Sequence, residues 1–360
     1  MRDKAERLNV QWRVKLGNKT DYGIGIVGCG GIVQYAHMPA YRKANFNVVA
    51  AYDIKKETAV ELARDFNIPR VHDSLEEILA DPEVEIVDIA VPPWAQLEIV
   101  EKVAAAGKHM LCQKPLADNF SDAVRIVELA EEAGVKQAVN HQMRWDAGIA
   151  ASRDLINRGF IGIPTDAQIQ VSCETAWHMW PWLAAAPRLE IMYHSIHYLD
   201  AMRSLFRNPR WVTSRHSRFA DQDKVQGETK TITVLDYPSG LQALVAVNHY
   251  NVHAETFATF HFLGTGGAID GTIGLMYDYP EGRPDTLVYS YKGSKHIEIE
   301  LDEMWIPDAF VGPMASLMEA IETDGLPFSN TRDNLDTLRV VYAAYLSARE
   351  NRSVRPEEIG

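Results

Sequence analysis

Residues 24–33 read Ile-Gly-Ile-Val-Gly-Cys-Gly-Gly-Ile-Val, an apolar run that turns into closely spaced glycines. The run Ile24–Val27 predicts a short buried strand, and the residues from Ile32 onward have helical spacing. Gly28 permits a turn off the strand, and Gly30 has no side chain, so a pyrophosphate can approach the backbone there. We therefore expect the strand, turn and helix that bind a dinucleotide; a plain glycine turn is the alternative.

The same pattern indicates which nucleotide is bound. Gly31 and Ile32 begin a helix whose free N–H groups face the phosphates, although Val33 stands where a third glycine is usual. The next apolar run, Val48–Tyr52, ends at Asp53. A carboxylate there accepts hydrogen bonds from ribose hydroxyls and repels a 2′-phosphate, so we expect NAD rather than NADP. A strand-end carboxylate without a ligand is the alternative.

Outward from this stretch, short apolar runs alternate with helical patterns. We expect strands at 48–52, 86–91, 109–112 and 137–140, and helices at 32–42, 56–66, 74–80, 96–106 and 121–133. This alternation predicts a doubly wound parallel sheet with helices on both faces. We therefore place a polar tail at 1–20 and a dinucleotide-binding Rossmann domain at 21–145.

Beyond residue 146 the pattern changes to longer segments in which polar and apolar residues alternate. We expect strands at 166–173, 229–236, 241–249, 256–263, 286–291 and 296–301, and helices at 151–158, 193–206, 314–323 and 334–351. Such alternation is typical of a mostly antiparallel sheet. The expected fold class is α/β, with the Rossmann domain followed by an α+β domain over 146–360 that has a large open sheet.

Composition and charge exclude several classes of protein. The 360 residues carry a formal net charge of −13, which repels phosphate backbones and argues against a nucleic-acid partner. Cys29, Cys112 and Cys173 lie too far apart to form a metal-ligand pair, and we interpret them as reduced thiols. No apolar run reaches the roughly 18–20 residues of a membrane span, and no secretory pattern precedes the fold. We expect a cytoplasmic protein.

The first motif that could carry chemistry is Gln113-Lys114-Pro115, which follows an expected strand. Ligands of open α/β sheets bind at that edge of the sheet. A lysine there can hydrogen-bond a substrate hydroxyl and lower the pKa of the proton that is lost. A cis bond at Pro115 would fix the direction of the lysine. A surface Lys-Pro loop is the alternative.

The second motif is a helix on which Tyr193, His194 and His197 can neighbour one another. A neutral histidine near pH 7 is suited to removing a hydroxyl proton, and buried structural histidines are the alternative. His194 and His197 could also bind a metal together with Glu190 or His178. Because the His-x-x-His spacing lacks a defined third ligand, we expect no metal.

In sequence order, Gly28–Ile32, Asp53, Gln113–Pro115 and His197–Asp200 resemble the motifs of the glucose–fructose oxidoreductase, inositol dehydrogenase and MocA (Gfo/Idh/MocA) family of NAD(P)-dependent oxidoreductases. The resemblance runs from about residue 22 to the C-terminus. It implies a Rossmann domain and an α/β domain whose open sheet joins subunits into a homodimer or homotetramer.

The resemblance also implies roles. Lys114 matches the lysine of the family's motif, usually Glu-Lys-Pro, so Gln113 is a departure from the usual glutamate. The family's helix usually has an aspartate four residues before the histidine, and Tyr193 stands there instead. His197 is then the expected base, and Tyr193 or His194 positions the substrate or assists proton transfer. The departures suggest a different substrate or a variant proton relay.

Further residues are expected around the cofactor and the substrate. Beyond the glycine turn and Asp53, the cofactor is expected to contact Pro92, Trp94, Gln96, Gln113, Lys114 and Gln142. The substrate is expected to contact Lys114, Arg144, Trp177, His178, His194 and His197. For Trp94 and Trp177 packing is an equal alternative, and Arg144 could instead pair with a carboxylate.

These features predict an NAD-dependent dehydrogenase that oxidises a secondary alcohol of a sugar, polyol, cyclitol or sugar derivative. One alternative is an enzyme that uses tightly bound NAD transiently for sugar elimination or glycosidic cleavage. The other is a dinucleotide-sensing regulator without turnover, which would not need both Lys114 and His197.

Overall fold

The computed structural model describes residues 8–219, 222, 224–291 and 295–360. The chain folds into two compact units. The first, here called the parallel-sheet unit, consists of Val14–Gln142 and Ile306–Leu335. The second, the open-sheet unit, consists of the described residues 8–13 together with Met143–Trp305 and Asp336–Gly360. Among the described residues no helix is both long and apolar enough to cross a bilayer.

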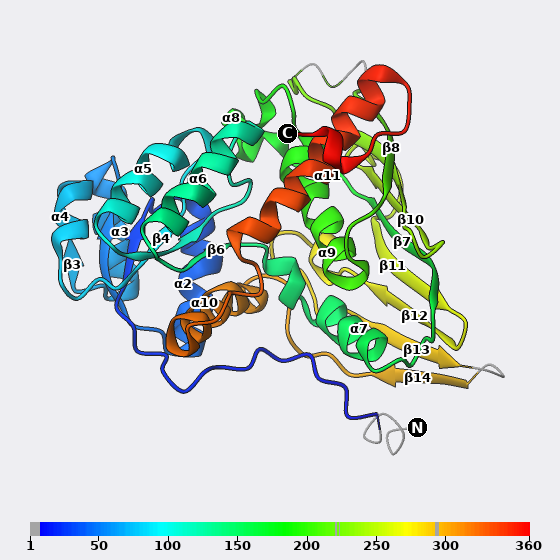
Figure 1. The fold of residues 1–360 in the computed structure, drawn as a ribbon, viewed down its shortest axis with the longest axis horizontal. Coiled ribbons are helices and arrows are strands. Elements are labelled where there is room, and N and C mark those ends of the chain that lie inside the picture. Colours follow the sequence, from blue (N-terminus) through cyan, green and yellow to red (C-terminus); the bar gives the residue numbers. More distant parts are fainter. Residues whose placement is uncertain (1–7, 220–221, 223, 292–294) are drawn as a thin grey trace. The chain divides into compact units, whose positions relative to one another are not determined.

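The parallel-sheet unit contains a six-stranded sheet with helices on both faces (Figure 1). Its strands are β1 (Ile24–Val27), β2 (Val48–Tyr52), β3 (Arg70–Val71), β4 (Ile86–Ile89), β5 (His109–Cys112) and β6 (Gln137–Val139). Every pair is parallel, in the order β3-β2-β1-β4-β5-β6. This is the order of a doubly wound dinucleotide-binding sheet, so the predicted fold class is confirmed.

The helices of this unit follow the predicted positions with shifted ends. They are η1 (Val33–His37), α2 (Met38–Ala44), α3 (Lys56–Phe66), α4 (Leu75–Ala80), α5 (Pro93–Ala105), α6 (Phe120–Glu132), η6 (Asp308–Phe310) and α10 (Val311–Thr323). Ser74 caps α4 by accepting the Glu77 N–H at 3.1 Å, as the spacing predicts. Helix α5 begins at Pro93, three residues earlier than expected, because proline needs no N–H partner in a first helical turn.

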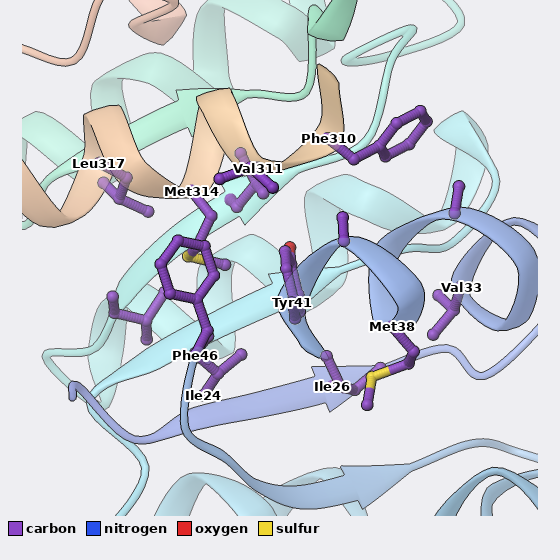
Figure 2. Close-up of a cluster of buried hydrophobic side chains, with 14 of the residues drawn as sticks. Ile24, Ile26, Val33, Met38, Tyr41, Phe46, Phe310, Val311, Met314 and Leu317 are labelled. Carbon is purple, nitrogen blue, oxygen red and sulfur yellow. The ribbon is translucent and has the colours of Figure 1, made fainter. Parts of the chain in front are cut away.

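The core of the parallel-sheet unit explains why residues 306–335 belong to it. Ile24 and Ile26 of β1, with Tyr41 of α2, lie in one buried cluster with Met314 and Leu317 of α10 (Figure 2). Burying these side chains together removes apolar surface from water, which favours this packing by roughly 25 cal/mol per Å². The structure thus differs from the expected continuous second domain, since a segment distant in sequence covers the first sheet.

The open-sheet unit contains eight strands in the order β14-β13-β12-β11-β7-β10-β9-β8. They are β7 (Pro164–Ser172), β8 (Trp211–Ser217), β9 (Lys230–Asp236), β10 (Gln242–Asn248), β11 (Phe257–Gly264), β12 (Gly267–Thr272), β13 (Leu287–Tyr291) and β14 (Lys295–Ile299). Only β7 and β10 pair in parallel. The predicted mostly antiparallel sheet is confirmed, whereas strands β8 and β12 were not expected because polar residues and glycines dominate them.

Helical segments complete the open-sheet unit. They are η2 (Gln142–Trp145), α7 (Ala147–Asn157), η3 (Trp177–Met179), α8 (Pro181–Ala184), η4 (Ile191–Ser195), α9 (Ile196–Phe206), η5 (Gly274–Met276), α11 (Thr331–Glu350) and η7 (Pro356–Glu358). The first residues of η2 and α11 belong to the other unit. The helix that the sequence predicts from residue 193 consists of a wide π-turn, η4, followed by α9. Such π-turns occur frequently at functional sites.

Candidate active site

The glycine turn lies at the carboxyl end of β1. Gly28 has a φ of +91°, and a Cβ there would lie 2.6 Å from the Ala90 carbonyl oxygen, so no larger residue fits. A Cβ added to Gly30 or Gly31 would meet no atom within 4 Å. The backbone is thus bare and open where a pyrophosphate needs a close approach, which fits a dinucleotide.

Asp53 lies beside this turn, as the sequence predicts. One of its carboxylate oxygens accepts the Cys29 N–H at 2.7 Å, and the other accepts the Lys55 N–H at 2.8 Å. The side chain is therefore oriented by the backbone on both sides before any ligand arrives. Each oxygen has a further lone pair that can accept a ribose hydroxyl.

The lysine loop follows β5. Gln96 is fully buried, and its Nε2 donates to the Gln113 carbonyl at 2.8 Å and to the Pro115 carbonyl at 2.7 Å. Gln96, which the sequence predicts to contact the cofactor, thus holds the backbone of this loop in place. The Lys114–Pro115 peptide bond is cis. The residue as a whole is half-buried, and burial lowers the pKa of the Lys114 ammonium group to about 7.

The histidine helix brings several aromatic rings together within the open-sheet unit. The ring of His197 is 5.3 Å from that of Trp305, and only 7% of the residue is exposed. One turn earlier, the ring of His194 lies 4.6 Å from that of His249 and 5.5 Å from that of Trp177. His197 and His194 thus lie in aromatic surroundings that suit the C–H face of a sugar.

His249 was not expected, and it contacts both polar and acidic groups of this cluster. Its Nδ1 lies 2.7 Å from Thr175 Oγ1 and 3.5 Å from Cys173 Sγ, and its Nε2 lies 3.8 Å from a Glu190 carboxylate oxygen. Burial acts to lower the pKa of His249, but Cys173 and Glu190 outweigh it and raise the pKa to about 9. Glu190 is itself held by Ser195, which donates at 2.6 Å.

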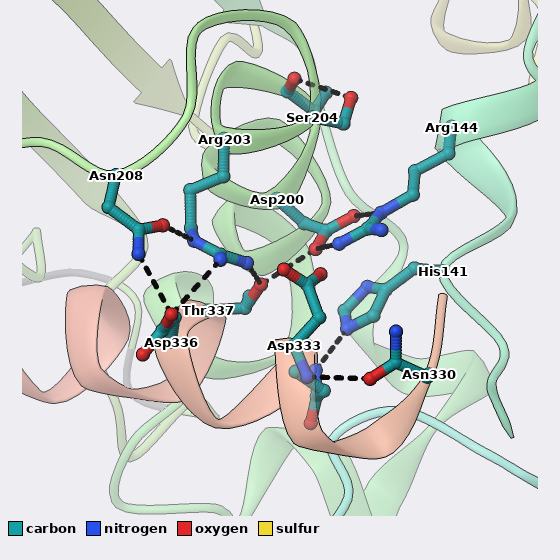
Figure 3. A network of polar contacts seen from close by, with 12 residues as sticks. His141, Arg144, Asp200, Arg203, Ser204, Asn208, Asn330, Asp333, Asp336 and Thr337 are labelled. Atoms are coloured by element: carbon teal, nitrogen blue, oxygen red, sulfur yellow. Dashed lines mark hydrogen bonds and ion pairs between the residues drawn. The ribbon is translucent and has the colours of Figure 1, made fainter. Parts of the chain in front are cut away.

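Arg144 forms a buried ion pair. Its guanidinium donates to both oxygens of Asp200, each at 2.7 Å, and Thr337 donates to the same carboxylate at 2.7 Å (Figure 3). Arg144 and Asp200 are 3% and 1% exposed. A bidentate pair of this kind favours the structural alternative for Arg144 over a substrate contact.

The remaining predicted residues divide by exposure. Trp94 is 60% exposed at the start of α5, just after Pro92, and His178 is exposed, so both are open to solvent. Tyr193 is buried against Trp182 with ring centroids 5.6 Å apart, and Gln142 is buried. Among the described residues, no three His, Cys, Asp or Glu side chains are arranged to hold a metal ion.

Comparison with known proteins agrees with this geometry. Residues 22–141 match the oxidoreductase family with an NAD-binding Rossmann fold, and residues 149–270 match the GFO/IDH/MocA C-terminal domain. The chain belongs to the Gfo/Idh/MocA family. It is therefore an oxidoreductase with an NAD-binding domain, as the motifs predict.

Three of its relatives cover nearly the whole chain. D-apiose dehydrogenase of Paraburkholderia graminis is 29% identical over 91% of this chain and 88% of its own. The 1,5-anhydro-D-fructose reductase of Ensifer adhaerens is 26% identical over 92% of this chain and 98% of its own. An oxidoreductase from Agrobacterium radiobacter, solved with NAD⁺, L-tartaric acid and magnesium, has a TM-score of 0.83 and 24% identity over 95% and 100% of the two chains.

Sequence reasoning missed the residues that support the Gfo/Idh/MocA motifs. In the open-sheet unit these are His249, Glu190 as its partner, and Trp305. His249 follows β10 directly, and β10 lies beside β7, so Cys173 and His249 end neighbouring parallel strands. The position of Cys173 and His249 directly after strands was the available signal in the sequence. It did not show that the two residues meet, because they are more than 70 residues apart.

Proposed function

We propose that this Gfo/Idh/MocA protein is an NAD-dependent dehydrogenase that oxidises a secondary alcohol of a sugar or a close relative. The observation that carries the proposal is Lys114, a lysine with a pKa of about 7 at the carboxyl edge of the NAD-binding sheet. A group that titrates near the working pH is suited to acid–base chemistry, and perturbed groups of this kind cluster at active sites.

In this proposal Lys114 and His197 have the separate roles that the Gfo/Idh/MocA motifs imply for them. Charged Lys114 hydrogen-bonds the substrate oxygen and stabilises the negative charge that develops on it. His197 removes the hydroxyl proton, and the edge of Trp305 limits the directions its ring can face. NAD, when bound, supplies the hydride acceptor.

The aromatic side chains around the histidine helix favour a carbohydrate-like substrate. Trp177 is buried against His194 and His249 and presents an apolar surface beside polar groups. Sugars need this combination, because their C–H faces pack on rings while their hydroxyls hydrogen-bond. The named relatives act on D-apiose and 1,5-anhydro-D-fructose, which supports an aldose, ketose or anhydrosugar.

The test is a substrate panel. Purified protein is mixed with NAD, and in parallel with NADP, and with pentoses that include D-apiose, hexoses, anhydrosugars, polyols and cyclitols, while nicotinamide absorbance is followed. We expect NADH formation with one carbohydrate class, and at least a hundredfold slower formation with Lys114→Ala. Consumption of a sugar without net NADH, by protein that retains its cofactor, would favour transient use of NAD instead. NAD binding without any turnover would favour the sensing role.

We also propose that the chain forms a homodimer or homotetramer through the face of the open sheet opposite its core. On this face Ile232, Phe257 and Leu263 are 48%, 45% and 40% exposed. Strand alternation places them with Gln168 and Gln170 on one side of the sheet. Sedimentation should give an assembly, and Ile232→Asp should shift it toward monomer.

A further inference from the structure

A buried histidine lies beneath the lysine loop of the parallel-sheet unit. His37, at the end of η1, is 1% exposed. Its Nδ1 lies 2.7 Å from one carboxylate oxygen of Asp88 on β4. Tyr41 donates its hydroxyl to the same oxygen at 2.8 Å. A carboxylate facing Nδ1 requires a proton on that nitrogen.

The other ring nitrogen faces two amides. His37 Nε2 lies 3.1 Å from Gln113 Nε2 and 3.1 Å from Asn140 Nδ2. The Gln113 amide can have only one orientation, because its Oε1 accepts the backbone N–H of Lys114 at 2.8 Å. Its NH₂ group therefore donates to His37. Nε2 must be an acceptor, so His37 is neutral with its proton on Nδ1.

We propose that His37 is a positioning residue that holds Gln113 and, through it, the backbone of Lys114. The chain of hydrogen bonds runs from Asp88 through the imidazole and the Gln113 amide to the Lys114 N–H. It ties the helix that follows the glycine turn to the lysine loop. The catalytic consequence rests on the proposed function, whereas the protonation state of His37 does not.

This network also accounts for glutamine at position 113. A glutamate has no N–H to offer, so its carboxylate would face the lone pair of His37 Nε2. Removing this repulsion would require a second proton on His37. The imidazolium would then lie between Asp88 and the new carboxylate. The new negative charge would also stand next to Lys114 and favour its charged form. Gln113 thus suits a neutral histidine and a lysine of low pKa.

One hydroxyl and two thiols close to this network stay neutral. Burial and Asp88 raise the pKa of the Tyr41 hydroxyl well above its usual value. Burial, with a contribution from Asp88, raises the pKa values of the Cys29 and Cys112 thiols to about 12. Asp88 is thus the acidic side chain that His37 contacts in this network.

The test combines NMR with pH profiles on the full-length protein. Imidazole ¹⁵N shifts, assigned by comparison with His37→Gln, should report a neutral His37 protonated on Nδ1 at pH 8. Gln113→Glu should make His37 doubly protonated and move the pH dependence of kcat/KM to higher pH. His37→Leu should lower kcat by about a hundredfold, the cost of a misplaced reacting group, while NAD affinity changes little.

Two variants separate positioning from mere stability. His37→Gln can still accept from Gln113 and donate to Asp88, so it should recover much of the kcat lost in His37→Leu. Tyr41→Phe removes a hydrogen bond from the same buried network but leaves Gln113 in place, so its pH profile should match wild type.

Several results would overturn the proposal: a proton on His37 Nε2 in the wild type, an unchanged His37 in Gln113→Glu, or equal losses in His37→Leu and Tyr41→Phe. If Gln113→Glu fails to fold, the position of the proton on His37 in the wild type and the kcat of His37→Gln still test the proposal. If no substrate is found, the NMR result decides alone.

Discussion

The pKa of a buried basic side chain is shifted in opposite directions in the two units. In the parallel-sheet unit, Lys114 has a pKa lowered to about 7 because burial dominates. In the open-sheet unit, His249 has a pKa raised to about 9 although burial acts to lower it. The neighbouring groups explain the shift at His249, because Glu190 and Cys173 lie beside it. At His249 the neighbouring groups outweigh burial, so the direction of a pKa shift depends on what surrounds the buried group as well as on burial.

The units also differ in how their chemistry is encoded. The turn at Gly28, Asp53 and the Lys114 loop are short segments at the carboxyl ends of β1, β2 and β5 in one parallel sheet. The cluster around His249 is assembled from three separate segments that contain Cys173, Glu190 and His249. A parallel sheet gathers strand ends at one edge by its topology, whereas the second cluster depends on a sheet order that is not local.

The largest expected effect concerns the buried lysine. Lys114→Ala should lower kcat by about 10²–10³-fold, the usual cost of removing one donor that stabilises a developing negative charge. In the wild type, kcat/KM should decline as pH rises through about 7, because the charged form of Lys114 is the one that stabilises the oxygen. Steady-state kinetics between pH 5.5 and 9 check both points, with NAD affinity as the control. A wild-type profile in Lys114→Ala would remove the lysine from the mechanism.

A second expected effect concerns the pair of Arg144 and Asp200. Arg144→Met leaves the Asp200 carboxylate buried without its main partner, which should lower the free energy of unfolding by about 3–5 kcal/mol. Urea unfolding measures this loss. Adding Asp200→Leu should restore part of it, because no uncompensated charge then remains. An unchanged free energy of unfolding together with a raised KM would instead indicate that Arg144 contacts the substrate.

A third effect sharpens the contrast between the two units. The raised pKa of His249 contributes stability that is fully present below the unfolded value near 6.5 and is lost as pH rises through about 9. His249→Gln should abolish this decline, which we expect to amount to about 3 kcal/mol. Thermal unfolding at pH 6 and pH 9.5 compares the two proteins. Parallel pH curves would contradict the partnered state of His249.

The smallest effect concerns two acids in the open-sheet unit. Burial and the neighbouring Asp285 raise the pKa of Asp146 well above its usual value. An acid whose pKa is raised on folding loses stability as pH rises above its unfolded value near 4. Asp146→Asn should therefore unfold less readily than wild type at pH 8, by about 1 kcal/mol, and equally at pH 4. Asp146 also caps α7 by accepting the Ile149 N–H at 3.3 Å, so a variant destabilised at both pH values would show that losing this cap outweighs the pKa effect.

Local sequence determined much of this protein. The apolar runs specified the parallel strands, and glycine specified the positive φ at Gly28, because both depend on neighbouring residues. The same local logic placed Asp53 and Lys114 after strands, and the family followed from those motifs. It did not give β8 and β12, whose polar and glycine-rich residues become strands only when paired with neighbours.

Tertiary structure alone decided which side chains meet. Residues 306–335 join the first sheet because α10 supplies apolar surface to its core, which no local pattern reports. His37 reaches Gln113, and His249 reaches Glu190, only because strands and helices distant in sequence are packed together. Hydrogen bonds and charge effects act over a few ångströms of space, and the chain that separates two partners does not limit them.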